Sequence, residues 1–229
     1  DNEMIVRSQS SVTYGTASTV ATGSIASTVS DDSKVVVFIT GQLNPDTGTA
    51  NYNTGQSTAE WDSANDRPIF RRGASGSDAS IVSYAVVEFT GQNWQIQRSE
   101  HTYSAAGVTE TESITSLSSL TRAFIHTQKR NGINATGTDE FGHEVWLSSV
   151  GFVSYFLEAG ATLPSQQTSV AWILENIQTS SGEMVVTRQP QGTSNGGAEP
   201  LTVSVSIGTT LDDLTNASIF GNSRAALTT

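Results

Sequence analysis

Residues 81–100 read IVSYAVVEFTGQNWQIQRSE and place two strand signals next to each other. Tyr84 to Phe89 is a short apolar run rich in β-forming residues, and Trp94 to Arg98 alternates apolar with polar residues. The four residues between these runs include Gly91, whose missing side chain permits a positive φ. The stretch therefore predicts a β-hairpin from Tyr84 to Arg98.

The rest of the chain shows the same kind of sequence pattern. Short apolar runs are separated by Ser, Thr, Gly and Asn, and helix-forming residues nowhere recur at a spacing of 3.6 over three turns. The runs are VVVFI, EVWL, FVSYFL, VAWIL and VSVSI. With 229 residues the chain can bury a sizeable core. We expect an all-β protein with an antiparallel, jelly-roll-like β-sandwich.

Charge and composition exclude several classes of function. The formal net charge is −11, from 22 acidic and 11 basic residues, and a balance this acidic argues against a protein that binds the phosphate backbone of nucleic acids. The absence of cysteine excludes disulfides, thiolate zinc sites and cysteine nucleophiles. No apolar run approaches the roughly 20 residues that a membrane-spanning helix needs.

An internal repeat organises the sequence. Three times an apolar strand ends in arginine, at Arg7, Arg98 and Arg188, and a Ser/Thr/Gly-rich stretch, a polar turn and another strand follow. The equivalent positions in that later strand are Lys34, Arg122 and Asn216, which lie 27, 24 and 28 residues after the arginines. A second match pairs SYAVVEF with SVAWILE and aligns Glu88 with Glu175. The period, close to 90 residues, fits one β-sandwich module.

The repeat predicts four ranges along the chain: an N-terminal arm or strand over 1–24, module 1 over 25–103, module 2 over 104–190, and a C-terminal strand segment over 191–229. The first and last ranges correspond to parts of a unit. Two arrangements would satisfy their backbone groups. The terminal strands pair within the chain, or each completes the sheet of a neighbouring subunit by strand addition.

The module resembles the repeated β domains of phage and prophage virion proteins, from tails and head decorations. The resemblance rests on a VVEF-like strand, a QIQR-like ending and a turn into an S-x-x-x-x-R-A-F-I strand, and it covers most of residues 25–190. The second copy departs from it, with ILEN in place of VVEF. The resemblance implies a role at a virion surface or in assembly, and it implies no catalytic residues.

Candidate metal and catalytic groups are sparse. Glu140, His143 and Glu144 form the densest metal-capable cluster, but a solvated loop is the favoured interpretation because alternate residues entering a strand point apart. Calcium could bind acidic loops, although none has the spacing of a dedicated calcium loop. These loops contain Asp31 and Asp32, Asp62 and Asp66, and Asp212 and Asp213.

Hydrolase chemistry has no better support. The chain has no G-x-S-x-G elbow, and His101 and His126 lie on or beside expected strands, where a histidine is usually structural. Glu88 and Glu175 are candidate glycosidase carboxylates only because they match between repeats. We therefore expect no enzyme activity, no catalytic residues, no metal site and no cofactor.

Two surface features suggest binding. Arg67, Phe70, Arg71 and Arg72 concentrate positive charge in an expected loop and could contact an acidic partner, against the alternative of a solvated loop. Trp61 lies between Glu60 and Asp62 and is the candidate platform for stacking a glycan, whereas Trp146 and Trp172 are expected in the core. Two sequons begin at Asn134 and Asn216 and have meaning only in a glycosylating host.

These observations favour a structural virion protein, as head decoration, tail or spike component. It would act at the virion surface or outside the cell, by self-association and docking to other virion proteins. The alternative is a lectin-like carbohydrate-binding β-sandwich that contacts cell-surface glycans through loop aromatics. No direct nucleic-acid partner and no membrane span are expected.

Overall fold

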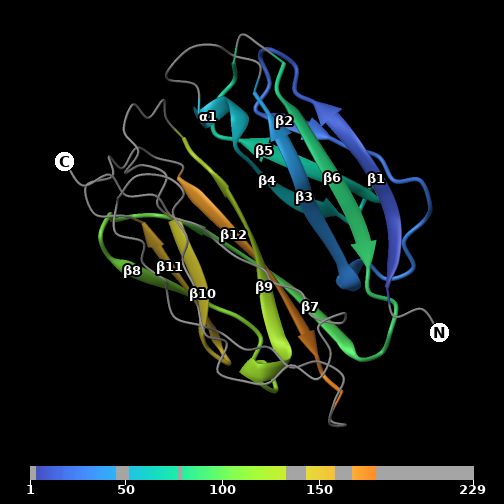
Figure 1. Ribbon diagram of the computed structural model, residues 1–229, viewed down its shortest axis with the longest axis vertical. Helices are drawn as coiled ribbons and strands as arrows, with labels where there is room; N and C mark the ends of the chain where they lie inside the picture. The colour runs from blue at the N-terminus through green and yellow to red at the C-terminus, as the bar shows by residue number, and fades with distance from the viewer. Residues whose placement is uncertain (1–3, 45–51, 77–78, 133–142, 158–166, 179–229) are drawn as a thin grey trace, which may run out of the picture.

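The computed structural model describes residues 4–44, 52–76, 79–132, 143–157 and 167–178. The fold is all-β and antiparallel, as the sequence predicts, and the strands within these ranges form four three-stranded sheets (Figure 1). The expected strands and loops over 133–142, 158–166 and 179–229 lie outside the described residues. They include Asp139, Glu140, Pro164, Asp212, Asp213, both sequons and the C-terminal strand segment.

The first module comprises six strands that form two facing sheets. One sheet has the order β1-β6-β3, and the other has the order β2-β5-β4. The bounds are β1 Ile5–Thr13, β2 Val20–Thr22, β3 Val35–Leu43, β4 Ser57–Asp62, β5 Arg67–Arg72 and β6 Ile81–Glu88. A 3-10 turn, η1 (Asp32–Lys34), leads into β3, and the short helix α1 (Tyr52–Gly55) precedes β4.

The second module has the same topology. Its sheets have the orders β7-β12-β9 and β8-β11-β10, which repeat the first module's orders with every strand number raised by six. The bounds are β7 Trp94–Thr102, β8 Thr109–Ser113, β9 Ala123–Arg130, β10 His143–Ser149, β11 Phe152–Leu157 and β12 Thr168–Asn176, with the 3-10 turn η2 (Leu120–Arg122) before β9. Two similar tandem modules are therefore confirmed.

The expected hairpin from Tyr84 to Arg98 is wrong. β6 is the central strand of its sheet, paired with β1 on one side and β3 on the other, while β7 pairs with β12. Both edges of β6 are occupied, so β7 has no place beside it. Residues 89–93 instead connect the modules, and the Lys34 ammonium donates to the Gly91 carbonyl oxygen across this connection at 2.7 Å.

Strand pairing also groups the chain differently from the expected ranges. β1 lies in the expected N-terminal arm and pairs with β6 inside the chain, which is the first of the two arrangements that the sequence left open for this arm. β7 lies in the expected range of module 1, yet it pairs with β12 of the second module. The reason is that each module begins with an edge strand and ends with the central strand of the same sheet. That order depends on contacts far apart in sequence.

The β7-β12-β9 sheet lies between the first module and the β8-β11-β10 sheet (Figure 1). Every residue of β12 is buried. Val170, Trp172 and Leu174 pack into the core of the first module, whereas Ala171 and Ile173 pack into that of the second. The core of the first module therefore extends onto one face of β12, while the other face of β12 belongs to a separate core cluster in the second module. Among the described residues, no helix has the length and apolar character needed to cross a bilayer.

Candidate functional site

The boundary between the modules brings together several polar contacts between side chains of the second module and the backbone of the first. Among the described strands only β5 pairs with β4, so β4 is an edge strand of its sheet there. The buried side chain of Gln128, on β9, fills the gap between β4 and β3. Its Nε2 donates to the Val37 carbonyl oxygen at 2.7 Å, and its Oε1 accepts from the Ala59 N–H at 2.7 Å. One amide side chain thus satisfies backbone groups on both sheets of the first module.

Two arginines complete this edge. Arg98 Nε donates to the Ala59 carbonyl oxygen at 3.1 Å, and an Arg130 guanidinium nitrogen donates to Thr58 Oγ1 at 2.7 Å. Both arginines also bind Glu100, at 2.5 and 2.9 Å. Burial raises the pKa of the Glu100 carboxyl, but the hydrogen bonds and charges of Arg98 and Arg130 outweigh burial and hold the pKa below its usual value.

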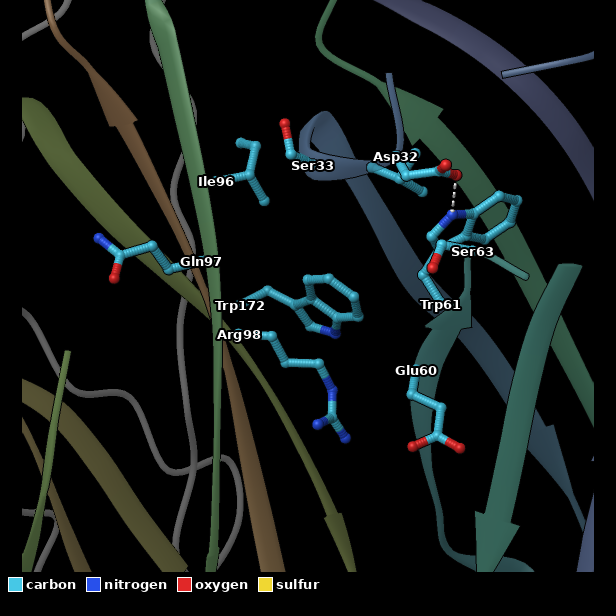
Figure 2. A pocket seen from close by; sticks show the side chains of 10 residues that line it. Asp32, Ser33, Glu60, Trp61, Ser63, Ile96, Gln97, Arg98 and Trp172 are labelled. Atoms are coloured by element: carbon cyan, nitrogen blue, oxygen red, sulfur yellow. Dashed lines mark hydrogen bonds between the residues drawn. The ribbon is translucent and has the colours of Figure 1, made fainter. Parts of the chain in front are cut away.

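A cleft of about 490 Å³ opens beside this edge (Figure 2). Its lining comes from both modules: Asp32, Ser33, Val35, Glu60, Trp61 and Ser63 from the first, and Ile96, Gln97, Arg98 and Trp172 from the second. Figure 2 shows the indoles of Trp61 and Trp172 on opposite sides of the opening. The exposed part of Trp61, together with the carboxylates and the guanidinium around the cleft, can stack on and hydrogen-bond to a polar ring.

Some of the side chains that line the cleft already contact one another. Trp61 Nε1 donates to Asp32 Oδ1 at 2.6 Å, so the indole is fixed against η1. The Arg98 guanidinium carbon lies 5.8 Å from the centroid of the Trp172 ring. Trp172 is 3% exposed, as expected for a core residue, and its Nε1 has no hydrogen-bond partner among the described residues. Trp61 is half-buried, and it lies within strand β4 instead of in a loop.

The predicted arginine cluster does not form one surface. Its residues lie on strand β5, where alternate side chains point to opposite faces. Phe70 is fully buried and packs on Tyr84 with 4.9 Å between ring centroids. Arg72 is 3% exposed and donates to three backbone carbonyl oxygens and to Ser80 Oγ.

Arg67 and Arg71 remain on the outer face of that strand, each paired with a carboxylate of β4. Arg67 binds Asp62 at 3.1 Å, and Arg71 binds Glu60 at 2.5 Å. The set Arg67, Phe70, Arg71 and Arg72 therefore offers a partner only these two arginines, and both are already ion-paired.

The matched glutamates are buried anchors for the turns that precede β3 and β9. Glu88 accepts from the backbone N–H groups of Ser30 and Asp31 at 3.0 and 2.8 Å, and it binds Arg7 at 2.6 Å. Glu175 accepts from the N–H groups of Ser118 and Ser119, at 2.7 and 3.0 Å. Matched sequence positions thus reflect matched packing.

The histidines are held inside the second module. His101 lies between Glu112 and Glu110, at 2.8 and 3.2 Å, and stacks on Tyr155. Burial lowers the pKa of His126 to about 4, and this ring packs on Phe38 of the first module at 4.9 Å.

His143 is buried, with Nδ1 2.8 Å from Ser169 Oγ, and burial together with the charge of Lys129 lowers its pKa to about 3. The cluster expected around Glu140 and His143 lies partly outside the described residues. Within the described part of the chain, no group of three metal-capable side chains comes together. The acidic loops use their carboxylates locally. Asp31 caps η1 and Asp62 pairs with Arg67.

Gln128, Arg130 and Glu100 carry no signal that marks them in the sequence as boundary residues, and the expectation that Trp146 lies in the core is wrong. Trp146 is 36% exposed on the outer face of β10, because the alternation of that strand directs Val145 and Leu147 to the core instead. Arg130 recurs as Arg224 when the third copy of the repeat is extended beyond Phe220, but this recurrence alone does not place it at a boundary.

No protein-family description, curated protein or solved structure matches this chain.

Proposed function

We propose that this protein is a structural virion subunit, as head decoration, tail or spike component, that acts by self-association and docking. One observation carries the proposal: β12 of the second module is buried on both faces, one against the core of the first module and one against the core of its own. Side chains of the second module, above all Gln128, also satisfy the edge backbone of the first. An extended stack of this kind suits load-bearing and surface display. The assignment to a virion rests on the resemblance of the repeated module to the β domains of phage virion proteins.

Solution mass as a function of concentration tests self-association. Sedimentation velocity of the whole chain over a hundredfold concentration range should show a defined oligomer that grows at the expense of the monomer. Density for the protein on a particle surface in electron micrographs of the native source would support docking. A monomer at every concentration, together with absence from particles, would rule the proposal out. Deleting β1 is unsuitable here, because β1 pairs with β6 within its own module.

The cleft between the modules supports a second candidate function, glycan binding. Tryptophan faces and edges bind sugar rings, and polar groups such as Glu60 and Arg98 supply orientation. Trp61→Ala should abolish binding on a glycan array, whereas Trp146→Ala should leave it unchanged. Trp146 is a matched control because its indole is exposed on a different sheet. Equal loss with both variants, or no glycan signal from the unaltered chain, would count against this function.

A further inference from the structure

A second cleft, of about 460 Å³, opens where the end of β5 meets strand β2 and the second module. Its lining consists of three arginines, of the loop 73–75 that follows β5, and of Thr19 and Val20. The arginines are Arg71 and Arg72 from the first module and Arg130 from the second, and we call the site the arginine cleft. Its volume lies in the range of sites that bind small molecules.

The charge of the arginine cleft is opposite to that of the chain. The net charge of the chain is −11, yet three of its 11 basic residues line this cleft, and none of the described residues that line it is acidic. By contrast, the lining of the cleft around Trp61 includes Asp32 and Glu60. A concave site with charges of one sign concentrates ligands of the opposite sign. The arginine cleft therefore favours an anion.

Arg72 is a buried cation that binds no carboxylate among the described residues. It is 3% exposed, and it donates to Ser80 Oγ and to the carbonyl oxygens of Ser18, Thr54 and Gly15. Burial lowers the pKa of Arg72, because these neutral acceptors do not fully replace water around the charge. A protein surface cannot reach a side chain at this depth, whereas an anion inside the cleft meets it and supplies the missing counter-charge.

Arg71 and Arg130 bring further donors to the same cleft. Arg71 uses Nε and one terminal nitrogen for Glu60, and Arg130 donates to Thr58 Oγ1 and to Glu100. A guanidinium has five N–H groups, so each of these arginines retains donors beyond those that its partners accept.

The charges of the three arginines act on one place. Burial raises the pKa of Tyr14 to about 12, and the hydrogen bond to Ser57 acts against this rise. The charges of Arg72, Arg130 and Arg71 act against it as well. The guanidinium carbon of Arg72 lies 4.6 Å from the centroid of the Tyr14 ring. The positive potentials of the three side chains therefore add up at this end of the first module.

The loop 73–75 adds backbone donors to the lining. Gly73 lies so close to the second module that an added Cβ would be 1.6 Å from the Asn131 carbonyl oxygen, so this position requires glycine. The N–H groups of Ala74 and Ser75 donate to no described residue, and both residues line the cleft. Successive N–H groups in a turn can bind an anion.

We propose that the arginine cleft binds a phosphate or sulfate group. Arg71 and Arg130 contact its oxygens, the buried charge of Arg72 balances its charge, and the loop 73–75 adds backbone donors. Guanidinium groups match the oxygens of such anions in bidentate geometry. The volume of the cleft exceeds that of one oxyanion and leaves space for a small molecule that carries it, such as a sugar. The proposal is independent of the virion assignment and of glycan binding in the other cleft.

Isothermal titration of the whole chain with inorganic phosphate and with glucose 6-phosphate tests the proposal, and glucose is the uncharged control. Both anions should bind, glucose should not, and added sodium chloride should weaken binding because salt screens the charges. Tighter binding of glucose 6-phosphate than of phosphate would assign the site to a phosphate ester, and equal binding would assign it to the free ion. No binding of either anion would overturn the proposal.

Two pairs of variants locate the binding. Arg71→Gln should weaken phosphate binding at least about tenfold, the scale of one hydrogen bond between charged groups. Arg67→Gln is the matched control, because Arg67 lies on the same face of β5, pairs with Asp62 and is outside the cleft. Its affinity should stay within about twofold of the unaltered chain, since exposed charges farther away are screened.

Glu60→Gln should act in the opposite direction. It releases Arg71 from its ion pair, so phosphate should bind about threefold more tightly, the scale of a partly exposed pair. Asp62→Asn removes the same charge beside Arg67 and should leave the affinity unchanged. A gain in affinity cannot result from a damaged fold. Equal effects within either pair of variants would show a response to net charge alone and would overturn the site.

Discussion

Glu88 and Glu175 occupy the same place in the two modules, but their surroundings differ. The Glu88 carboxylate is fully buried and binds Arg7 in addition to the turn N–H groups of Ser30 and Asp31. Glu175 Oε2 has no hydrogen-bond partner among the described residues. Removing the charge of Glu88 therefore leaves the largely buried guanidinium of Arg7 without its counter-ion, whereas no described cation loses a counter-ion when the charge of Glu175 is removed.

Glu88→Gln should lower the free energy of unfolding by about 3 kcal/mol, the scale for breaking a buried ion pair. Glu175→Gln should cost about 1 kcal/mol, the scale of a weakened hydrogen bond. Urea unfolding at neutral pH measures both values. Equal losses in the two variants would show that the Arg7 pair adds nothing beyond the turn contacts.

His126 and His143 should make the protein sensitive to mild acid. Burial lowers the pKa of His126 to about 4, below the usual 6.5, so the unfolded chain takes up this proton first as the pH falls. Stability is complete above pH 6.5 and declines between pH 6.5 and 4, by up to about 1.4 kcal/mol per pH unit for one proton.

Replacing His126 by Phe keeps a ring against Phe38 and removes this titration, so the decline should become shallower by about one proton. Unfolding free energies measured from pH 7 to 4 test this. The remaining decline belongs to His143, whose pKa is lowered to about 3. An unchanged slope in the His126→Phe protein would contradict the assignment.

At the scale of elements, β4 depends on side chains from another module. Gln128 bonds to the Ala59 N–H and the Val37 carbonyl oxygen across the gap between β4 and β3. Gln97 makes a comparable pair of bonds to the Thr115 backbone, but in an exposed position where water can replace them. Burial should decide how much each glutamine contributes.

Gln128→Ala should lower the free energy of unfolding by about 2 to 3 kcal/mol, because it leaves two buried backbone groups unsatisfied. Gln97→Ala should cost less than about 1 kcal/mol. Denaturant unfolding gives both numbers, and faster exchange of the Ala59 amide in Gln128→Ala alone would locate the effect. A loss as large in Gln97→Ala would show that burial is not the cause.

At the scale of the whole molecule, the packing of β12 on both cores should make the two modules unfold together. Trp172 packs into the core of the first module, although its strand belongs to the second, while its neighbour Ile173 packs into the second core. The unaltered chain should therefore show one thermal transition, seen alike by fluorescence and circular dichroism.

Trp172→Ala should cost about 3 to 5 kcal/mol and should speed hydrogen exchange in β3 and β6 of the first module. Ile173→Ala should cost about 2 to 5 kcal/mol, with its fastest exchange confined to the second module. If exchange in β3 and β6 is unaffected by Trp172→Ala, the modules are energetically independent and the packing of β12 on the first core is only a contact.

The sequence by itself determined the fold class, the tandem repeat and the matched glutamates. Strand periodicity, turn residues and repeated motifs are local signals, and local signals can be read from the linear sequence without knowledge of tertiary contacts. It also marked Trp172 correctly as core, because that residue lies in a continuous apolar run.

Tertiary structure alone decided which strands pair and which faces are buried. β6 and β7 look like a hairpin because they are adjacent, but β6 pairs with β1 and β3, whose residues lie far away in sequence. Phe70 and Arg72 are buried while Arg71 is not, because alternate side chains of β5 point toward the core. The sequence alone does not show which of the two faces of this strand is buried. Gln128 has its role only because β4 lies beside it, and that proximity arises from the packing of one module on another.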